Sequence, residues 1–284
     1  MRCKTVILLA ITAFAAVQAQ AQAAILGSAQ DFAVLGASTV TNTGPTSIWG
    51  DLGVDPGTAI TGFPPGILTG GSMYEPGDVA RQARKDALTA YLYLAELSST
   101  THYSSPADLG GLTLSPGVYK FDSSAQLTGT VTLNFGANPN ANFVFQIGST
   151  LTTASDSSVN VINGGRLSGV YWQVGSSATL GTSTMFAGNI LADQSITLNS
   201  GADILCGRAI ALNAAVTMDT NTISNNNTLQ DFDSDRSDFG SYGFSGGAPI
   251  PEPSSFLVFG SLMGLFVLRR CTRRYRTRYC GSRG

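Results

Sequence analysis

The sequence predicts an all-β fold, a β-solenoid with one long α-helix packed alongside, and three observations predict it. A short word of sequence recurs at near-regular spacing, its strands alternate apolar with polar residues, and one long amphipathic stretch interrupts them. Stacked coils that each contribute short strands produce this pattern. A β-sandwich also has many short strands and is the competing fold, but a sandwich does not require the same word at each pass.

The recurring word is clearest where residues 145–153 match residues 172–180. Its second half recurs around five central threonines, whose spacings are 20, 27, 18 and 20 residues: Thr132, Thr152, Thr179, Thr197 and Thr217. Successive residues of a strand point to opposite faces, so the apolar neighbours of these threonines are expected to fill a shared core. The threonines themselves are then expected to point outward.

The amphipathic stretch predicts a helix over residues 78–97. Its apolar residues follow three- and four-residue spacing, which is the period of one helix face. They are Val79, Ala83, Ala87, Ala90, Tyr91, Leu94 and Leu97. A helix that is apolar on one side has to pack against something, and we expect it to cover one side of the solenoid.

Both ends of the chain have the pattern of processing signals. Residues 1–24 combine a basic start, an apolar run and small-residue sites, which is typical of a secretory signal peptide. Near the other end, Pro251, Glu252 and Pro253 precede an uncharged apolar run and an arginine cluster that begins at Arg269 and Arg270.

This C-terminal arrangement, residues 250–284, resembles the PEP-CTERM sorting tail of Gram-negative bacteria. The resemblance implies processing by an exosortase and transient or retained anchoring in the membrane. A plain membrane anchor with a basic flank is the alternative. The domain organisation is then a signal peptide, a solenoid over 25–228, an acidic Ser/Gly linker over 229–249 and the sorting segment.

The segment between the two signals is acidic. Residues 25–248 hold seventeen Asp and Glu against seven Lys and Arg, a net charge of about ten negative units. Nucleic-acid binding needs clustered basic residues, so this function class is excluded. Cys206 is the one cysteine of this segment, so no disulfide can form within it.

Several stretches resemble the bacterial and fungal ice-binding-like family. Residues 32–35, 38–46, 50–54 and 56–57 match its opening, and residues 114–119, 172–175 and 188–192 match later stretches. The resemblance covers about 26–223. It implies a right-handed, discontinuous β-solenoid of triangular section with an α-helix alongside, and it implies an exported protein that adsorbs to ice.

The resemblance also implies where ice would be bound. Parallel coils stack roughly 4.7–4.9 Å apart, so one outward threonine per coil gives an evenly spaced ladder with a stiff side chain on each rung. The five central threonines would form one file, with a parallel file two residues earlier and an extension from the N-terminal coil: Ser177, Ser195, Ala215, Thr39 and Thr41.

The sequence leaves two alternatives to ice binding. Threonine is a good strand residue, and a threonine ladder can be purely structural. The sorting tail and the acidic body favour a secreted or cell-surface matrix or adhesion protein of an exopolysaccharide-producing bacterium.

An enzyme is not expected, and neither a metal nor a cofactor is predicted. His102 is the only histidine and is placed in a polar loop after the helix, so a Ser-His-Asp site would rest on it alone. The sequence has no His/Cys cluster at metal-ligand spacing. The scattered charged residues Lys120, Arg166, Asp193 and Arg208 are predicted to be surface charges at corners.

Overall fold

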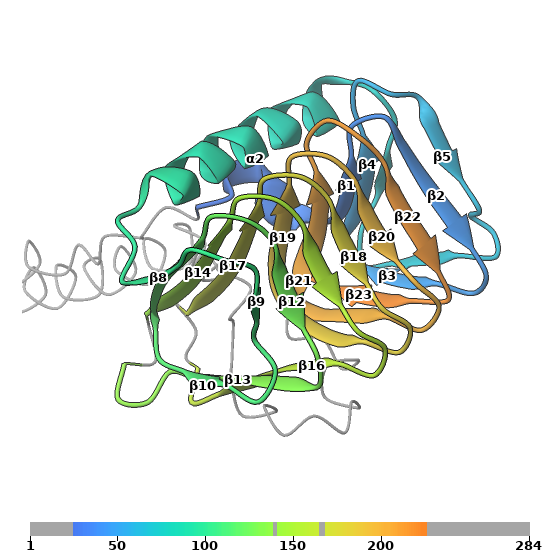
Figure 1. The fold of residues 1–284 in the computed structure, drawn as a ribbon. Coiled ribbons are helices and arrows are strands. Elements are labelled where there is room, and N and C mark those ends of the chain that lie inside the picture. The colour runs from blue at the N-terminus through green and yellow to red at the C-terminus, as the bar shows by residue number, and fades with distance from the viewer. Residues whose placement is uncertain (1–24, 139–140, 165–167, 226–284) are drawn as a thin grey trace, which may run out of the picture. The chain divides into compact units, whose positions relative to one another are not determined.

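The computed structural model describes residues 25–138, 141–164 and 168–225, which form a three-sided stack of parallel strands with one helix alongside (Figure 1). Strands pair in parallel on each side of the stack. The predicted β-solenoid with an accompanying helix is therefore confirmed, and the β-sandwich alternative is wrong.

The first side, here called the helix face, carries α2 (Asp78–Glu96) and the short 3-10 helix η1 (Gly27–Asp31). Its strands, in spatial order, are β8 (Thr101–Tyr103), β11 (Gly117–Phe121), β14 (Asn142–Ile147), β17 (Gly169–Val174), β19 (Met185–Ala192), β21 (Asp203–Ala211), β1 (Phe32–Gly36), β4 (Asp51–Val54) and β7 (Met73–Tyr74).

The second side, here called the ladder face, is a separate sheet. Its strands, in spatial order, are β9 (Ala107–Asp108), β12 (Ala125–Leu127), β15 (Leu151–Thr153), β18 (Ala178–Leu180), β20 (Ile196–Leu198), β22 (Val216–Asp219), β2 (Thr39–Thr43) and β5 (Ala59–Thr61).

The third side, here called the third face, joins the helix face through the long strands β19 and β21. Its other strands are β10 (Thr113–Leu114), β13 (Thr130–Asn134), β16 (Ser158–Ile162), β23 (Thr222–Ser224), β3 (Ser47–Trp49) and β6 (Ile67–Thr69).

Two glycines let β19 and β21 bend around the edge between these faces. The register between the two strands shifts between Ala187 and Asn189. A Cβ on Gly207 would lie 1.9 Å from the carbonyl oxygen of Gly188, and Gly188 itself has a φ of +96°. The backbones approach too closely here for any larger residue.

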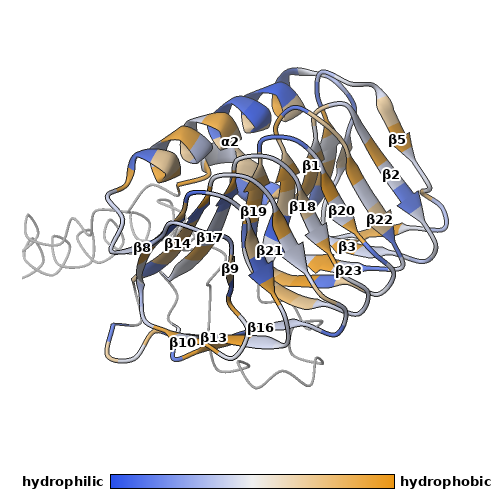
Figure 2. Cartoon of the chain, in the orientation of Figure 1, coloured by the Kyte–Doolittle hydropathy of each residue, from blue (hydrophilic) through white to orange (hydrophobic). Residues whose placement is uncertain are grey.

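The interior of the stack is filled by the inward side chains of all three faces. In the centre the rings of Phe145 and Trp172 stack with centroids 3.9 Å apart, and Phe186 packs against Trp172 at 5.0 Å. Figure 2 shows hydrophobic and hydrophilic residues mixed along the strands and around α2, as expected for elements with one buried side.

The coils do not stack in the order of the sequence. The N-terminal coil lies beyond the last coil, because β1 pairs with β21, β2 with β22 and β3 with β23. The chain then forms the end of the stack with β4 to β7, and α2 follows before the chain re-enters at β8 (Figure 1). The stack is therefore discontinuous, as the family resemblance implied.

Helix α2 ends within one residue of its predicted range, but its buried side differs from the prediction. Val79 is 51% exposed, so its assignment to the apolar stripe is wrong. The buried residues are spaced by three and four and begin one position later: Ala80, Ala83, Ala87, Ala90 and Leu94. They pack with Tyr171, Leu191 and Ile210 of the helix face.

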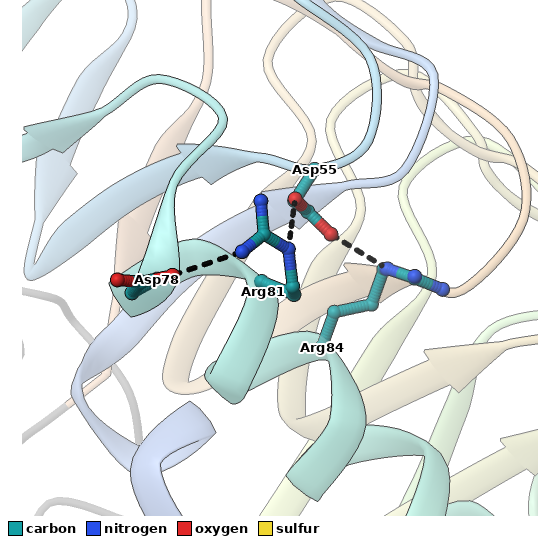
Figure 3. A network of polar contacts seen from close by, with 4 residues as sticks. All are labelled: Asp55, Asp78, Arg81 and Arg84. Carbon is teal, nitrogen blue, oxygen red and sulfur yellow. Dashed lines mark hydrogen bonds and ion pairs between the residues drawn. The ribbon is translucent and has the colours of Figure 1, made fainter.

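Polar contacts fix both ends of α2. At the N-terminal end, the buried carboxylate of Asp55 lies 3.7 Å from Nε of Arg81 and 3.2 Å from Nε of Arg84 (Figure 3). At the C-terminal end, Nε2 of the buried Gln146 donates to the carbonyl oxygens of Leu94 at 2.7 Å and Leu97 at 2.8 Å. Carbonyl oxygens at the C-terminal end of a helix lack donors within the helix, and Gln146 supplies a donor for them.

The predictions for the chain ends concern residues outside the described ranges. They are the signal peptide, the linker and the sorting segment with Pro251, Glu252, Pro253, Arg269 and Arg270. None of the helices in the described ranges has both the length and the hydropathy of a membrane span.

Candidate functional site

The ladder face carries a straight file of outward residues, here called the central file. The strand registers pair each member directly with the next. From one end of the stack to the other the file reads Thr61, Thr41, Thr217, Thr197, Thr179, Thr152, Gln126 and Asp108. Six consecutive rungs are therefore threonine.

Alternation within each short strand aims the file at solvent. Thr197 lies between Ile196 and Leu198, which are 0% and 1% exposed. β18 and β22 repeat the arrangement, each with one threonine between two buried apolar residues. Anchoring by buried neighbours on both sides holds these three strands, and so their threonines, at a fixed height above the core.

The six threonine hydroxyls have no hydrogen-bond partner among the described residues. Thr61, Thr152 and Thr217 are exposed, whereas Thr41, Thr179 and Thr197 are half-buried between their neighbours. Each hydroxyl is thus available to water, and each side chain is stiff about χ1. The result is a row of methyl and hydroxyl groups repeated about every 4.8 Å.

A second row, here called the flanking file, lies two residues before the central file. Its members come from successive coils: Thr39, Ala215, Ser195, Ser177, Thr150 and Ser124. Several of its hydroxyls bond to one another, Ser177 to Ser195 at 3.0 Å and Ser124 to Thr150 at 2.8 Å. The flanking file therefore offers fewer free hydroxyls to solvent than the central file does.

The prediction that Thr132 belongs to the central file is wrong. Thr132 lies in β13 on the third face, where it pairs with Thr113 on one side and Asn160 on the other. The ladder strand of that coil is β12, in which Gln126 takes the outward position. Thr132 also stands between two buried apolar residues, so alternation alone could not tell the two faces apart.

The other predicted site residues lie together on the ladder face. Thr152, Thr179, Thr197, Thr217 and Thr41 are in the central file, and Ser177, Ser195, Ala215 and Thr39 are in the flanking file. Thr61, Gln126 and Asp108 were not predicted, since β5, β12 and β9 do not contain the recurring word. Their only signal is one outward residue beside buried or half-buried neighbours.

One end of the central file is charged. The carboxylate of Asp108 accepts hydrogen bonds from the backbone N–H groups of Gly110 and Thr128, both at 2.9 Å. Partial burial acts to raise the pKa of Asp108, but these hydrogen bonds outweigh it and leave the pKa below its usual value. Asp108 is therefore ionised at neutral pH.

His102 and Arg208 do not lie where the sequence predicted them. His102 lies in strand β8 rather than in a loop; it is exposed, with Nε2 2.8 Å from Oδ1 of Asp122. Arg208 is 1% exposed, so the prediction of a surface charge is wrong. Within the described residues no group of three His, Cys, Asp or Glu side chains is placed to hold a metal ion.

A sequence model of the family described as Ice-binding-like matches residues 34–224 of this chain. The chain belongs to the ice-binding-like family. The match covers the stack from β1 to β23, including every threonine of the central file.

Members of the ice-binding-like family resemble this chain in both sequence and structure. An ice-binding protein of Nostoc sp. (strain HG1) is 51% identical over 277 residues, which cover 95% of this chain and 97% of the relative. The crystal structure of an ice-binding protein from the Antarctic ascomycete Antarctomyces psychrotrophicus has a TM-score of 0.68 at 40% identity, covering 73% of this chain and all of that one. An ice-binding protein from an Antarctic biological consortium has a TM-score of 0.66 at 46% identity, covering 73% of this chain and 93% of that one. These relatives are described as ice-binding proteins rather than enzymes.

Proposed function

We propose that this protein adsorbs to ice through the ladder face. The observation that carries the proposal is the run of six threonines in register, whose hydroxyls have no hydrogen-bond partner among the described residues. Family membership and the printed names of the relatives support the same function.

The regular order and the rigidity of the ladder face favour adsorption to ice. A regular row of methyl and hydroxyl groups can hold a layer of water in a repeating arrangement that joins an ice surface. The free energy of ordering that layer is small when the side chains are already fixed, because little side-chain entropy is lost on binding. Buried residues on both sides of five of the six threonines supply this rigidity.

The low charge of the ladder face favours it as the surface that contacts ice. Among its described strands neither Lys nor Arg occurs, and the carboxylates are confined to Asp108 at one end and Asp219 at the rim. Asp219 accepts a hydrogen bond from Oγ1 of Thr220 at 3.0 Å and so does not lie free on the face. A weakly charged surface loses less hydration free energy when it meets ice.

The first prediction is that a bulky residue in the central file abolishes adsorption. A Thr197→Tyr variant should lose thermal hysteresis, because an aromatic ring in the middle of the file prevents the flat approach of the lattice. The measurement compares the gap between melting and freezing of single ice crystals in purified wild-type and variant protein at equal concentration.

A Thr132→Tyr variant is the matched control, since Thr132 stands on the third face. It should keep the wild-type hysteresis, and both variants should keep the wild-type melting temperature of the protein. Loss in Thr132→Tyr with retention in Thr197→Tyr would move the site to the third face. Unhindered crystal growth in the wild-type protein would contradict ice binding and favour the matrix or adhesion function.

We also propose that the protein is exported and that its C-terminal segment anchors it transiently or permanently at the cell surface. The order of motifs in residues 1–24 and 250–284 supports this. An acidic linker would hold the solenoid away from the envelope.

The second prediction concerns these ends. Mass spectrometry of the protein from its producing cells should find an N-terminus near residue 25 and a C-terminus within or before the segment 250–284. Recovery of the intact 284-residue chain from the cytosol would contradict export. An intact C-terminus in the membrane fraction would instead favour a plain anchor over exosortase processing.

A further inference from the structure

The central file changes chemistry abruptly at β12 while the sheet beneath it does not. Gln126 pairs with Thr152 in the same unbroken register that relates Thr152 to Thr179. Ala125 and Leu127 are buried on either side of Gln126, as the neighbours of five of the six threonines are; those of Thr61 are half-buried. The support for a seventh rung is present, and only the outward side chain differs.

Glutamine is a poor substitute for threonine in such a row. Gln126 is exposed and makes no side-chain hydrogen bond within the described residues. Its chain is two atoms longer than that of threonine and has three rotatable bonds, so fixing it costs more side-chain entropy than fixing a threonine does. Its amide stands above the plane of the threonine methyl groups and holds its own hydration water.

The next position closes the file for a different reason. Asp108 is ionised, and its carboxylate is held at the surface by the N–H groups of Gly110 and Thr128. A fixed charge keeps a hydration shell that an ice lattice cannot accept without a free-energy cost. The two residues therefore end the face in two steps, first by length and mobility and then by charge.

Building on the proposed function, we propose that ice contact is confined to the six-threonine part of the central file and that Gln126 sets its boundary. The contact region then spans five strand spacings, roughly 24 Å, at the end of the stack that contains β5 and β2. The coils with β9 and β12 carry no ice contact.

The test is a gain of function. Gln126→Thr should raise thermal hysteresis at equal protein concentration, by on the order of one sixth or more, because six rungs become seven and adsorption scales with contact area. The converse variant Thr152→Gln should lower hysteresis, since it moves the boundary inward by one rung. Threonine suits an outward strand position, so Gln126→Thr should keep the wild-type circular dichroism spectrum.

Lys120→Thr is the matched control, because Lys120 is an exposed residue of the same coil on the helix face. It should leave hysteresis unchanged. Unchanged or reduced hysteresis in a folded Gln126→Thr variant would overturn the boundary, as would full activity in Thr152→Gln.

Failure of the proposed boundary at Gln126 can be distinguished from failure of the proposed ice binding. An active wild type that loses activity in Thr197→Tyr but does not respond to Gln126→Thr overturns the boundary alone. An inactive wild type overturns ice binding itself, and the boundary with it.

Discussion

At the scale of single residues, Arg208 joins three parts of the chain that are distant in sequence. Its guanidinium donates to the carbonyl oxygen of Gln30, to Oδ1 of Asn189 at 2.6 Å and to the carbonyl oxygen of Asn225 at 3.3 Å. Burial lowers the pKa of Arg208 to about 10, and the neighbouring Tyr171 and Asp31 act in the opposite direction. The guanidinium stays charged at neutral pH and donates hydrogen bonds to amide and carbonyl oxygens.

The third prediction is that Arg208→Met destabilises the fold. Methionine fills similar volume but leaves two buried oxygens and one partly buried oxygen without this donor, which should cost about 2–4 kcal/mol. The melting temperature should then fall by roughly 5–15 °C, measured by circular dichroism. Lys120→Met, an exposed control, should change it little. An Arg208→Met variant as stable as the wild type would show that these bonds contribute nothing net.

Residue identity in the central file could be predicted where the recurring word marks it and, for Thr41, where the family resemblance implied it. Thr152, Thr179, Thr197 and Thr217 carry the word, and all four lie in the file. Thr132 carries part of it on another face, and Thr61 lacks it altogether. Alternation says that a side chain points outward, but in a three-sided stack it does not say from which side.

At the scale of elements, α2 is held by its ends as much as by its apolar stripe. The stripe is mostly alanine, so it buries little apolar area per turn. Gln146 and Asp55 fix the two ends from different coils, and Asp86 accepts from the N–H and Oγ of Ser28 at 2.9 and 2.6 Å. These contacts set the position of the helix along the stack.

The fourth prediction tests the contact of Gln146 with the C-terminal end of α2. Gln146→Leu keeps the size of the side chain but leaves carbonyl oxygens of α2 without a donor, at a cost of about 1–3 kcal/mol. The midpoint of urea unfolding should fall without a change in slope. Gln194→Leu, at an exposed corner, should shift it by less than about 0.5 kcal/mol. Equal midpoints for both variants would contradict the anchoring role of Gln146.

The existence of α2 was predictable from period, but its anchors were not. Gln146 belongs to the recurring word and is an outward strand residue, which by pattern alone indicates a solvent position. It is buried because the helix crosses above it, and a contact 52 residues away in sequence leaves no local trace. Val79 was misassigned for the related reason that a large apolar residue outweighs an alanine in a periodicity count.

At the scale of the whole molecule, the ladder face is assembled from two separate parts of the chain. Thr217 pairs with Thr41 across the join between the last coil and the N-terminal coil. Backbone bonds close the join, including Thr220 N–H to the carbonyl of Thr43 at 3.0 Å and Ser47 N–H to the carbonyl of Asn221 at 2.8 Å. The family resemblance implied such a discontinuous order, which the period of the repeat alone could not predict.

This join has a consequence for the order of events in the cell. Thr41 and Thr217 are 176 residues apart (217 minus 41), so the first rungs to leave the ribosome are among the last to gain a neighbour on their inner side. Pairings of such large sequence separation form slowly, because the loop entropy is lost before the contact stabilises anything. Strand β2 of the N-terminal coil can pair with β5 early, but it cannot pair with β22 until the end of the solenoid has been synthesised.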